Sequence, residues 1–157
     1  MNKKNKFLWI GITTLAVTFF AWQFISATPS KPSAGSELIK KVSNEQEFSA
    51  IINNAGTKLI VLDLYADWCG PCRMLHPTLV SLARKYAGQV AFYQINVDEN
   101  PGIASALGTN GIPYVVFVKY KKALTSITGL NPAESYEKII SNYSSNQGTQ
   151  GKTLEKL

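Results

Sequence analysis

Alternating apolar and polar segments predict nine elements of secondary structure between residues 37 and 143. Five of them have the short apolar runs of strands, namely 37–42, 58–66, 90–97, 114–119 and 123–128. The run at 58–66, KLIVLDLYA, is nearly continuous, which is typical of a central strand covered on both faces. One acid, Asp63, interrupts it. The segments at 114–119 and 123–128 are joined by Tyr-Lys-Lys and predict a β-hairpin.

Four further segments show helical periodicity or helix-end signals, namely 43–56, 70–86, 100–108 and 131–143. Ser43 and Gln46 predict a capping box at the first helix, and Gly56 ends that helix. Asn131 is expected to cap the last helix, with Pro132 at its first position. Strands that alternate with helices form a mainly parallel sheet, to which the hairpin adds an antiparallel edge. The expected fold class is α/β, with a central mixed five-stranded sheet flanked by four helices.

An apolar segment without charges precedes these elements at residues 7–25. As a helix it would measure about 28 Å, close to the ~30 Å hydrocarbon core of a bilayer. Lys3, Lys4 and Lys6 precede it, so the N-terminus is expected to stay in the cytoplasm. The segment therefore predicts a single transmembrane helix in the inner or cytoplasmic membrane, with the domain facing the periplasm or cell exterior. The alternative is a signal peptide cleaved near Ala27, which leaves a soluble exported protein.

Composition and charge separate the domain from its flanking segments. Residues 26–36 are rich in Ser, Pro and Ala and predict a linker, 37–144 predict the domain, and 145–157 predict a polar, flexible tail. The formal net charge of the chain is +6, but residues 37–143 hold ten Lys and Arg against nine Asp and Glu. Because the folded part is nearly neutral, no nucleic-acid partner is expected.

Both cysteines, Cys69 and Cys72, lie in the segment WCGPC, where the strand at 58–66 is followed by the helix at 70–86. A structural zinc site requires four ligands, and His76 is the only other soft ligand, so no metal site is expected. An incidental pair of thiols does not explain a Gly-Pro turn at a helix start. A redox pair does, because the N–H groups and dipole at a helix N-terminus stabilise a thiolate.

The segments around these cysteines resemble the thioredoxin family from about Glu37 to Tyr143. LDLYADWC contains the first cysteine, and NVDENPG, GIPY and TGL follow in the family's order and spacing. The resemblance implies a thioredoxin fold in which Cys69 is the attacking nucleophile and Cys72 the resolving thiol. It also implies that Asp63 is a buried acid beneath Cys72, with a raised pKa that suits a proton acceptor. The alternative for Asp63 is a core carboxylate without a catalytic role.

The resemblance further implies a substrate-binding surface beside the cysteine pair. Pro113 matches the family's cis-proline, which faces the disulfide and lines the substrate groove. An ordinary proline at a strand start is the alternative reading of this position. The other positions that match this surface are Trp68, Gly70, Pro71, Ile112 and Gly129.

Three positions depart from the family pattern. Gln94 occupies a position where many members have a lysine beside the buried acid, and Tyr65 one where many have a tryptophan. His76 follows Cys72 by four residues, which places both on the same helix face. A lone helical histidine is usually a surface or packing residue. Because histidine changes its charge between about pH 5 and 8, His76 is also a candidate proton relay.

The expected function is reduction of protein disulfides outside the cytoplasm by a thiol-disulfide oxidoreductase that residues 7–25 hold in the membrane. The Cys69–Cys72 pair is the expected redox group, without another cofactor, and a membrane thiol carrier is the expected reductant. Three alternatives stay open: an oxidase that donates its disulfide, a thiol reductase of cytochrome c maturation, and a binding module that uses the apolar groove. The Gly-Pro dipeptide favours the reductase. A pure binder would keep its activity after both cysteines are replaced by serine.

Overall fold

A computed structural model describes residues 38–144 and 152–153 of the chain. The elements of this part are, in chain order, β1 (Ile39–Lys41), α2 (Glu45–Asn54), β2 (Leu59–Tyr65), α3 (Gly70–Lys85), β3 (Val90–Asn96), α4 (Pro101–Ala106), β4 (Tyr114–Lys119), β5 (Lys122–Thr128), α5 (Ala133–Ser144) and β6 (Lys152–Thr153). The six described strands form one mixed sheet in the order β1-β3-β2-β4-β5-β6. β1, β3 and β2 run parallel, whereas β4 is antiparallel to β2, and β5 to β4.

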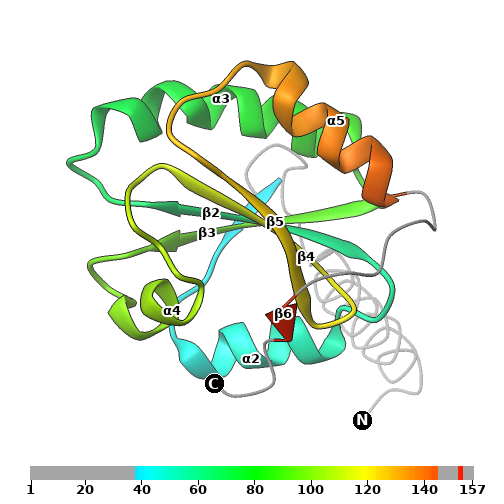
Figure 1. The fold of residues 1–157 in the computed structure, drawn as a ribbon, viewed down its shortest axis with the longest axis horizontal. Helices are drawn as coiled ribbons and strands as arrows, with labels where there is room; N and C mark the ends of the chain where they lie inside the picture. The colour runs from blue at the N-terminus through cyan, green and yellow to red at the C-terminus, as the bar shows by residue number, and fades with distance from the viewer. Residues whose placement is uncertain (1–37, 145–151, 154–157) are drawn as a thin grey trace, which may run out of the picture. The chain divides into compact units, whose positions relative to one another are not determined.

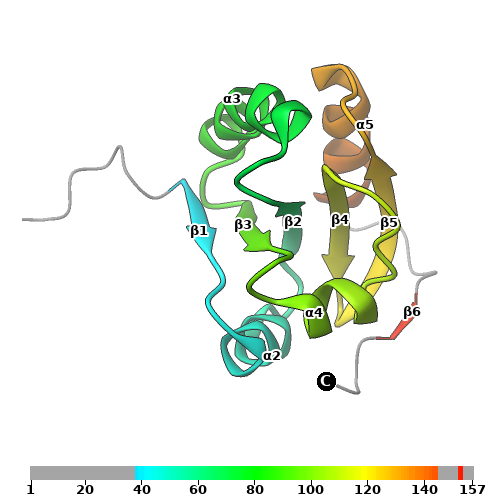
Figure 2. The ribbon, with the colours of Figure 1, turned by 90° about the vertical axis from the view of Figure 1, so that its left-hand side faces the viewer.

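The helices cover the sheet on both faces (Figure 1). α3 and α5 lie on one face and α2 and α4 on the other, with β2 near the middle of the strand order (Figure 2). Successive side chains of a strand point to opposite faces. Leu59 and Val61 accordingly belong to the core under α3 and α5, whereas Ile60 and Leu62 belong to the core under α2 and α4. The same alternation puts Asp63 on the face that α3 covers.

The five predicted strands and four predicted helices are confirmed, and no boundary differs by more than two residues. The hairpin between β4 and β5 turns at Tyr120 and Lys121, whose φ angles are 51° and 60°. Positive φ at both positions is the geometry of a two-residue hairpin turn. The short strand β6 pairs antiparallel with β5 and falls within the predicted tail, 145–157. The rest of that tail lies outside the described residues.

The described part of the chain contains no helix that is both long and apolar enough to cross a membrane. The predicted transmembrane segment, 7–25, and the predicted linker, 26–36, lie outside the described residues. The structure therefore does not test the predicted transmembrane helix.

The start of α2 corrects the predicted capping box by one residue. Asn44 is the N-cap, and its Oδ1 accepts a hydrogen bond from the Glu47 N–H at 2.8 Å. The Glu47 carboxylate in turn accepts the N–H of Ser43 at 2.8 Å. Asn and Ser are about equally good N-caps, and the sequence Ser-Asn-Glu-Gln-Glu fits a capping box in either register.

The start of α5 also differs from its prediction. The helix begins at Ala133, and the side-chain amide of Asn131 does not act as the predicted N-terminal acceptor in any described hydrogen bond. Its Nδ2 instead donates to the carbonyl oxygens of Thr128 and Gly129, both at 3.1 Å. Asn131 thus holds the turn between β5 and α5.

A buried lysine connects the far end of β4 to the end of α5. Lys119 is 3% exposed, and its Nζ donates to the carbonyl oxygen of Tyr143 at 2.7 Å. The last carbonyls of a helix lack helical partners and carry partial negative charge. The ammonium group therefore satisfies one of them while it obtains a partner of its own.

Asn44→Ala should destabilise the domain by about 1 kcal/mol, because the Glu47 N–H loses its acceptor. For a domain of this size the expected fall in Tm is roughly 4 °C, measured by circular dichroism on heating. Ser43→Ala is the matched control, because it keeps the backbone N–H that donates to Glu47. An equal fall in Tm in the control would restore the cap predicted from the sequence.

Candidate active site

The two cysteines form a disulfide at the junction of β2 and α3, with an S–S distance of 2.03 Å. Cys69 is the N-cap of α3, and its Sγ accepts a hydrogen bond from the Cys72 N–H at 3.2 Å. Gly70 and Pro71 occupy the first two positions of the helix. A proline at this point loses no hydrogen bond, because the first N–H groups of a helix have no helical acceptor. The sulfur of Cys69 therefore lies at the electropositive end of α3.

Burial does not distinguish the two cysteines in the disulfide form. Cys69 is 3% exposed and Cys72 is 5% exposed, and both pack with Ala66. The predicted difference in reactivity therefore depends on their positions in the helix. Cys69 is the N-cap, with its sulfur at the helix end, whereas Cys72 belongs to the first turn.

The loop before β4 lies against the disulfide. The Ile112–Pro113 peptide bond is cis, as the resemblance implied, and Ile112 packs on the cluster that contains both cysteines. The carbonyl of Pro113 accepts the N–H of Gly129 at 2.7 Å, and the carbonyl of Gly129 accepts the Tyr136 hydroxyl at 3.3 Å. Gly129 has a φ of 79°, which favours glycine. These bonds join the loops that contribute the predicted positions Ile112, Pro113 and Gly129.

Trp68 exposes a large apolar surface next to the disulfide. The side chain is 70% exposed, and its only described hydrogen bond runs from the indole N–H to the Asp98 carboxylate at 2.9 Å. Asp98 lies in the loop between β3 and α4, and its own N–H donates to Asn96 Oδ1 at 3.0 Å. An exposed aromatic ring held at one edge is a suitable surface for docking another chain.

Asp63 is buried in β2 on the face covered by α3, as predicted, and is 4% exposed. Burial raises its pKa from 3.8 to about 7. In the described part of the chain its Oδ1 atom has no hydrogen-bond partner. Its register partners are Gln94 on β3 and Val115 on β4, and neither carries a charge that could lower the pKa.

A cavity of about 370 Å³ lies between this acid and Cys72. Its walls come from β2 and the loop that follows it, from the first turns of α3, and from β3; the lining residues are Asp63, Tyr65, Ala66, Asp67, Cys72, Arg73, His76 and Gln94. The cavity thus brings together the predicted acid, the predicted resolving cysteine and all three departures from the family pattern. His76 is exposed and lies in the same wall as Cys72.

Sequence reasoning assigned no role to several residues that shape this site. Arg73 donates from Nη1 to the carbonyl of Asp67 at 2.9 Å, and both residues line the cavity. Asp98 holds Trp68, and Tyr136 holds Gly129. Asp98 lies in the motif NVDENPG, so the sequence contained a signal for its role. Tyr136 is a core position of an amphipathic helix, and nothing in the sequence distinguished it from other core residues.

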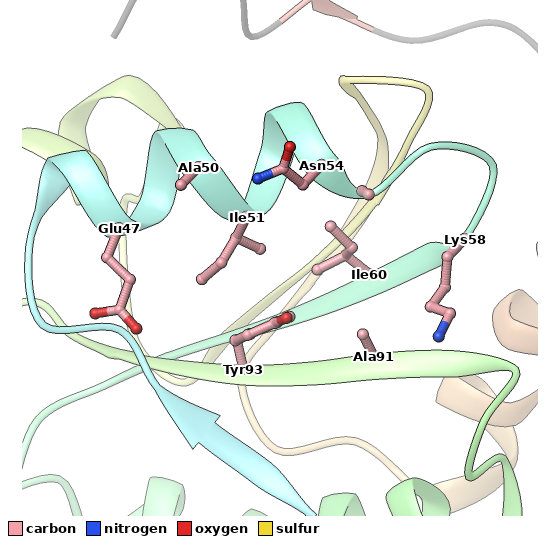
Figure 3. A pocket seen from close by; sticks show the side chains of 9 residues that line it. Glu47, Ala50, Ile51, Asn54, Lys58, Ile60, Ala91 and Tyr93 are labelled. Carbon is pink, nitrogen blue, oxygen red and sulfur yellow. The ribbon is translucent and has the colours of Figure 1, made fainter.

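A second cavity, of about 390 Å³, lies on the opposite face of the sheet (Figure 3). It opens between α2 and the strands β2 and β3, where Glu47 and Ile51 on the helix face Tyr93 on β3. Its other lining residues are Ala50, Asn54, Ala55, Lys58, Ile60 and Ala91. Neither cysteine contributes to it, so it is separate from the candidate site. Within the described ranges, no three His, Cys, Asp or Glu side chains come close enough to hold a metal ion.

A disulfide at the start of a helix, beside an exposed aromatic ring and over a buried acid, is the arrangement of a thiol-disulfide oxidoreductase. The family model described as Thioredoxin matches residues 39–142, and the chain belongs to the thioredoxin family. Thioredoxins reduce disulfides with their own cysteines. The predicted membership of the thioredoxin family is therefore confirmed, and the predicted Cys69–Cys72 pair is present as a disulfide.

Several known proteins resemble the chain over this domain. Thioredoxin-2 of Saccharomyces cerevisiae is 33% identical over 105 residues, which are 67% of this chain and 99% of that protein. The chloroplastic Thioredoxin M4 of Arabidopsis thaliana is 40% identical over 84 residues, 54% of this chain and 44% of that protein. The crystal structure of oxidized mitochondrial thioredoxin 3 from Saccharomyces cerevisiae has 36% identity and a TM-score of 0.61, covering 66% of this chain and 94% of that one. The chain spans 44% and 59% of the first two curated relatives, less than two thirds of their length.

These relatives correct the predicted location. The sequence predicted an inner or cytoplasmic membrane with the domain facing the periplasm or exterior, or else an exported protein cleaved near Ala27. The M-type relatives from Arabidopsis thaliana, Pisum sativum and Spinacia oleracea are instead chloroplastic thioredoxins, so that prediction is wrong. It rested on the hydropathy of residues 7–25, and hydropathy measures an apolar run without identifying a compartment.

Asp63 should make the oxidised domain less stable as the pH rises from about 4 to about 7. Burial raises its pKa from 3.8 to about 7, so in this range the folded state keeps a proton that the unfolded state has lost. The free energy of unfolding then falls with rising pH, by about 2–3 kcal/mol between pH 5 and pH 8, because each pH unit between the two pKa values corresponds to about 1.36 kcal/mol. Asp63→Asn cannot titrate and should lack this fall. Urea unfolding of both oxidised proteins at the two pH values measures it, and parallel pH dependences would contradict the buried, uncompensated acid.

Proposed function

We propose that the domain reduces disulfides of protein substrates, with Cys69 as the nucleophile and Cys72 as the resolving thiol. The observation that carries this proposal is the position of the Cys69 sulfur at the N-terminus of α3, where it accepts the Cys72 N–H at 3.2 Å. The same N–H and the helix dipole stabilise a thiolate on Cys69 in the reduced protein. A thiolate is the form of cysteine that attacks disulfides.

The reaction consists of two exchanges. The Cys69 thiolate attacks one sulfur of the substrate disulfide, forms a mixed disulfide and releases the first substrate sulfur as a thiolate. Cys72 then loses its proton and attacks the Cys69 sulfur, which forms the Cys69–Cys72 disulfide and releases the second substrate thiolate. Two electrons pass from the cysteine pair to the substrate, and the substrate thiolates take up protons from solvent.

Asp63 is the proposed acceptor of the Cys72 proton. Both residues line the same cavity. The carboxyl has a pKa of about 7, so near neutral pH it exchanges a proton without a large free-energy cost in either direction. A carboxyl with an ordinary pKa would be a much weaker base.

The substrate-binding surface is proposed to surround the disulfide on three sides. Trp68 supplies an exposed aromatic ring, and Gly70 and Pro71 form the helix start. The cis-peptide loop at Ile112–Pro113 and the adjoining Gly129 form the opposite border. A substrate disulfide must reach Cys69, which is 3% exposed, so the docked chain has to fit closely into this surface.

The dithiol must be regenerated by a separate reductant after each turnover. The membrane thiol carrier predicted from the sequence depended on the membrane location that the relatives contradict. The proposal therefore requires only a dithiol donor.

Whether the pair acts as a reductase or an oxidase follows from its reduction potential, which spans about −270 to −120 mV among proteins with such pairs. The thioredoxin relatives favour the reductase.

Cys72→Ser should convert the domain into a trap that accumulates a mixed disulfide between Cys69 and its substrate. Cys69→Ser is the matched control and should form none, because the nucleophile is missing. Non-reducing electrophoresis after incubation with a protein disulfide substrate measures both.

In the reduced wild-type domain, alkylation near pH 7 should label Cys69 before Cys72. Trapping through Cys72 in the control, or faster labelling of Cys72, would reverse the assignment. Disulfide reduction that persisted after both cysteines were changed to Ser would contradict the redox role.

A further inference from the structure

Asp63 needs a path by which its proton can leave. In the proposed reaction the acid accepts one proton from Cys72 in each cycle and must lose it before the next. It is 4% exposed, and α3 covers its face of the sheet. Direct exchange with bulk water is therefore restricted, so the walls of the adjoining cavity determine the route.

The cavity has the size and the polarity for water to enter. Its volume of about 370 Å³ is well above the ~30 Å³ that one water occupies in the liquid. Asp63 lines this space, and its Oδ1 atom has no hydrogen-bond partner among the described residues. Gln94 is the register partner of Asp63, and its amide both donates and accepts hydrogen bonds. These groups provide the polar partners that a buried water requires.

The charged and titratable groups of the walls differ in their capacity to carry a proton. Tyr65 on β2 has a pKa raised above its usual 10 by burial, so it keeps its proton near neutral pH. Asp67 and Arg73 carry opposite charges, and the guanidinium already donates to the Asp67 carbonyl at 2.9 Å. Gln94 on β3 cannot titrate. His76 on α3 is exposed to solvent, and histidine is the residue type that exchanges protons between about pH 5 and 8.

Resting on the function proposed above, we infer that the cavity between β2, β3 and α3 is the path by which Asp63 exchanges its proton with solvent, and that His76 is the relay residue in its outer wall. Two observations carry this inference. Asp63 and His76 line one cavity from opposite layers, the sheet and the helix. His76 is also exposed, so one residue borders both the cavity and bulk water.

The proton balance of this step is simple. The S–H bond of Cys72 breaks, its proton passes to the Asp63 carboxylate, and the Cys72 thiolate forms the new S–S bond with Cys69. The carboxylic acid then gives the proton to water in the cavity, and the imidazole ring of His76 passes it on to solvent. Both groups return to their starting states. No oxidant beyond the substrate disulfide is consumed.

The test follows the reaction of the reduced full chain with one equivalent of 5,5′-dithiobis(2-nitrobenzoate) in weakly buffered solution. The first thionitrobenzoate is released when Cys69 attacks, and the second when Cys72 resolves the mixed disulfide. Burial raises the pKa of Asp63, so more molecules hold a protonated acid as the pH falls, and this acid must lose its proton before the second release. At pH 6, His76→Ala should slow the second release by about threefold to tenfold, less than the ~10²-fold or more of a direct general base. The first release should be unchanged.

Two features separate a relay from a structural role. The slowing should shrink towards pH 8, where Asp63 has already lost its proton, and added imidazole should restore the rate of the variant. Met74→Ala is the matched control, since it also removes a long exposed side chain from α3, outside the cavity walls. It should leave both releases unchanged.

Different results would contradict the relay and the proposed function on which it rests. An equal second release in His76→Ala and wild type at every pH would overturn the relay, as would a slowing that imidazole does not rescue. Failure of the wild type to make the second release would instead overturn Cys72 as the resolving thiol. A second release that is unchanged in Asp63→Asn would remove the proposed acceptor, whatever His76 does.

Discussion

The short connection between β2 and α3 is the constraint on which the site depends. β2 is buried on both faces and bonded to β3 and β4, so its end has a fixed position in the sheet. Only Ala66, Asp67 and Trp68 separate that end from Cys69. The helix must therefore start directly above the strand, with its N-terminal N–H groups at the cysteines. Because α3 then packs back over the same strand, an inward side chain of β2 lies beneath its first turns.

This geometry explains why a polar group can be kept in the core. Asp63 shares its face of β2 with Leu59 and Val61, which pack under α3 and α5. Burying an acid without a hydrogen-bond partner lowers stability, and a hydrophobic residue at this position would pack without that penalty. The adjoining cavity is large enough for water, and a water there would give the carboxyl a hydrogen-bond partner and so reduce this cost. Local instability of this kind is typical of functional sites, where residues that the reaction requires lower the stability of the fold.

Much of the fold could be predicted because its strongest signals are local. The apolar run of β2, the cysteine turn at the start of α3 and the hairpin between β4 and β5 each lie within one stretch of sequence. Competing local signals caused the errors at helix starts: Ser43 and Asn44 are both good N-caps, and Asn131 has the right type for a cap but uses its amide as a donor. The cavity could not be predicted from the sequence, because it depends on the strand register. That register pairs Asp63 with Gln94, which is thirty-one positions away along the chain.

The buried lysine at the end of β4 has a consequence for where the domain can be divided. The family match ends at residue 142, one position before the carbonyl that Lys119 binds. A fragment cut at that boundary would retain the ammonium group in the core and lose its acceptor, and an unpaired buried charge is among the most destabilising defects in a protein. The smallest autonomous unit must therefore include Tyr143. Its C-terminal limit is determined by the hydrogen-bond partner of one side chain on β4, rather than by the point at which the helical pattern weakens.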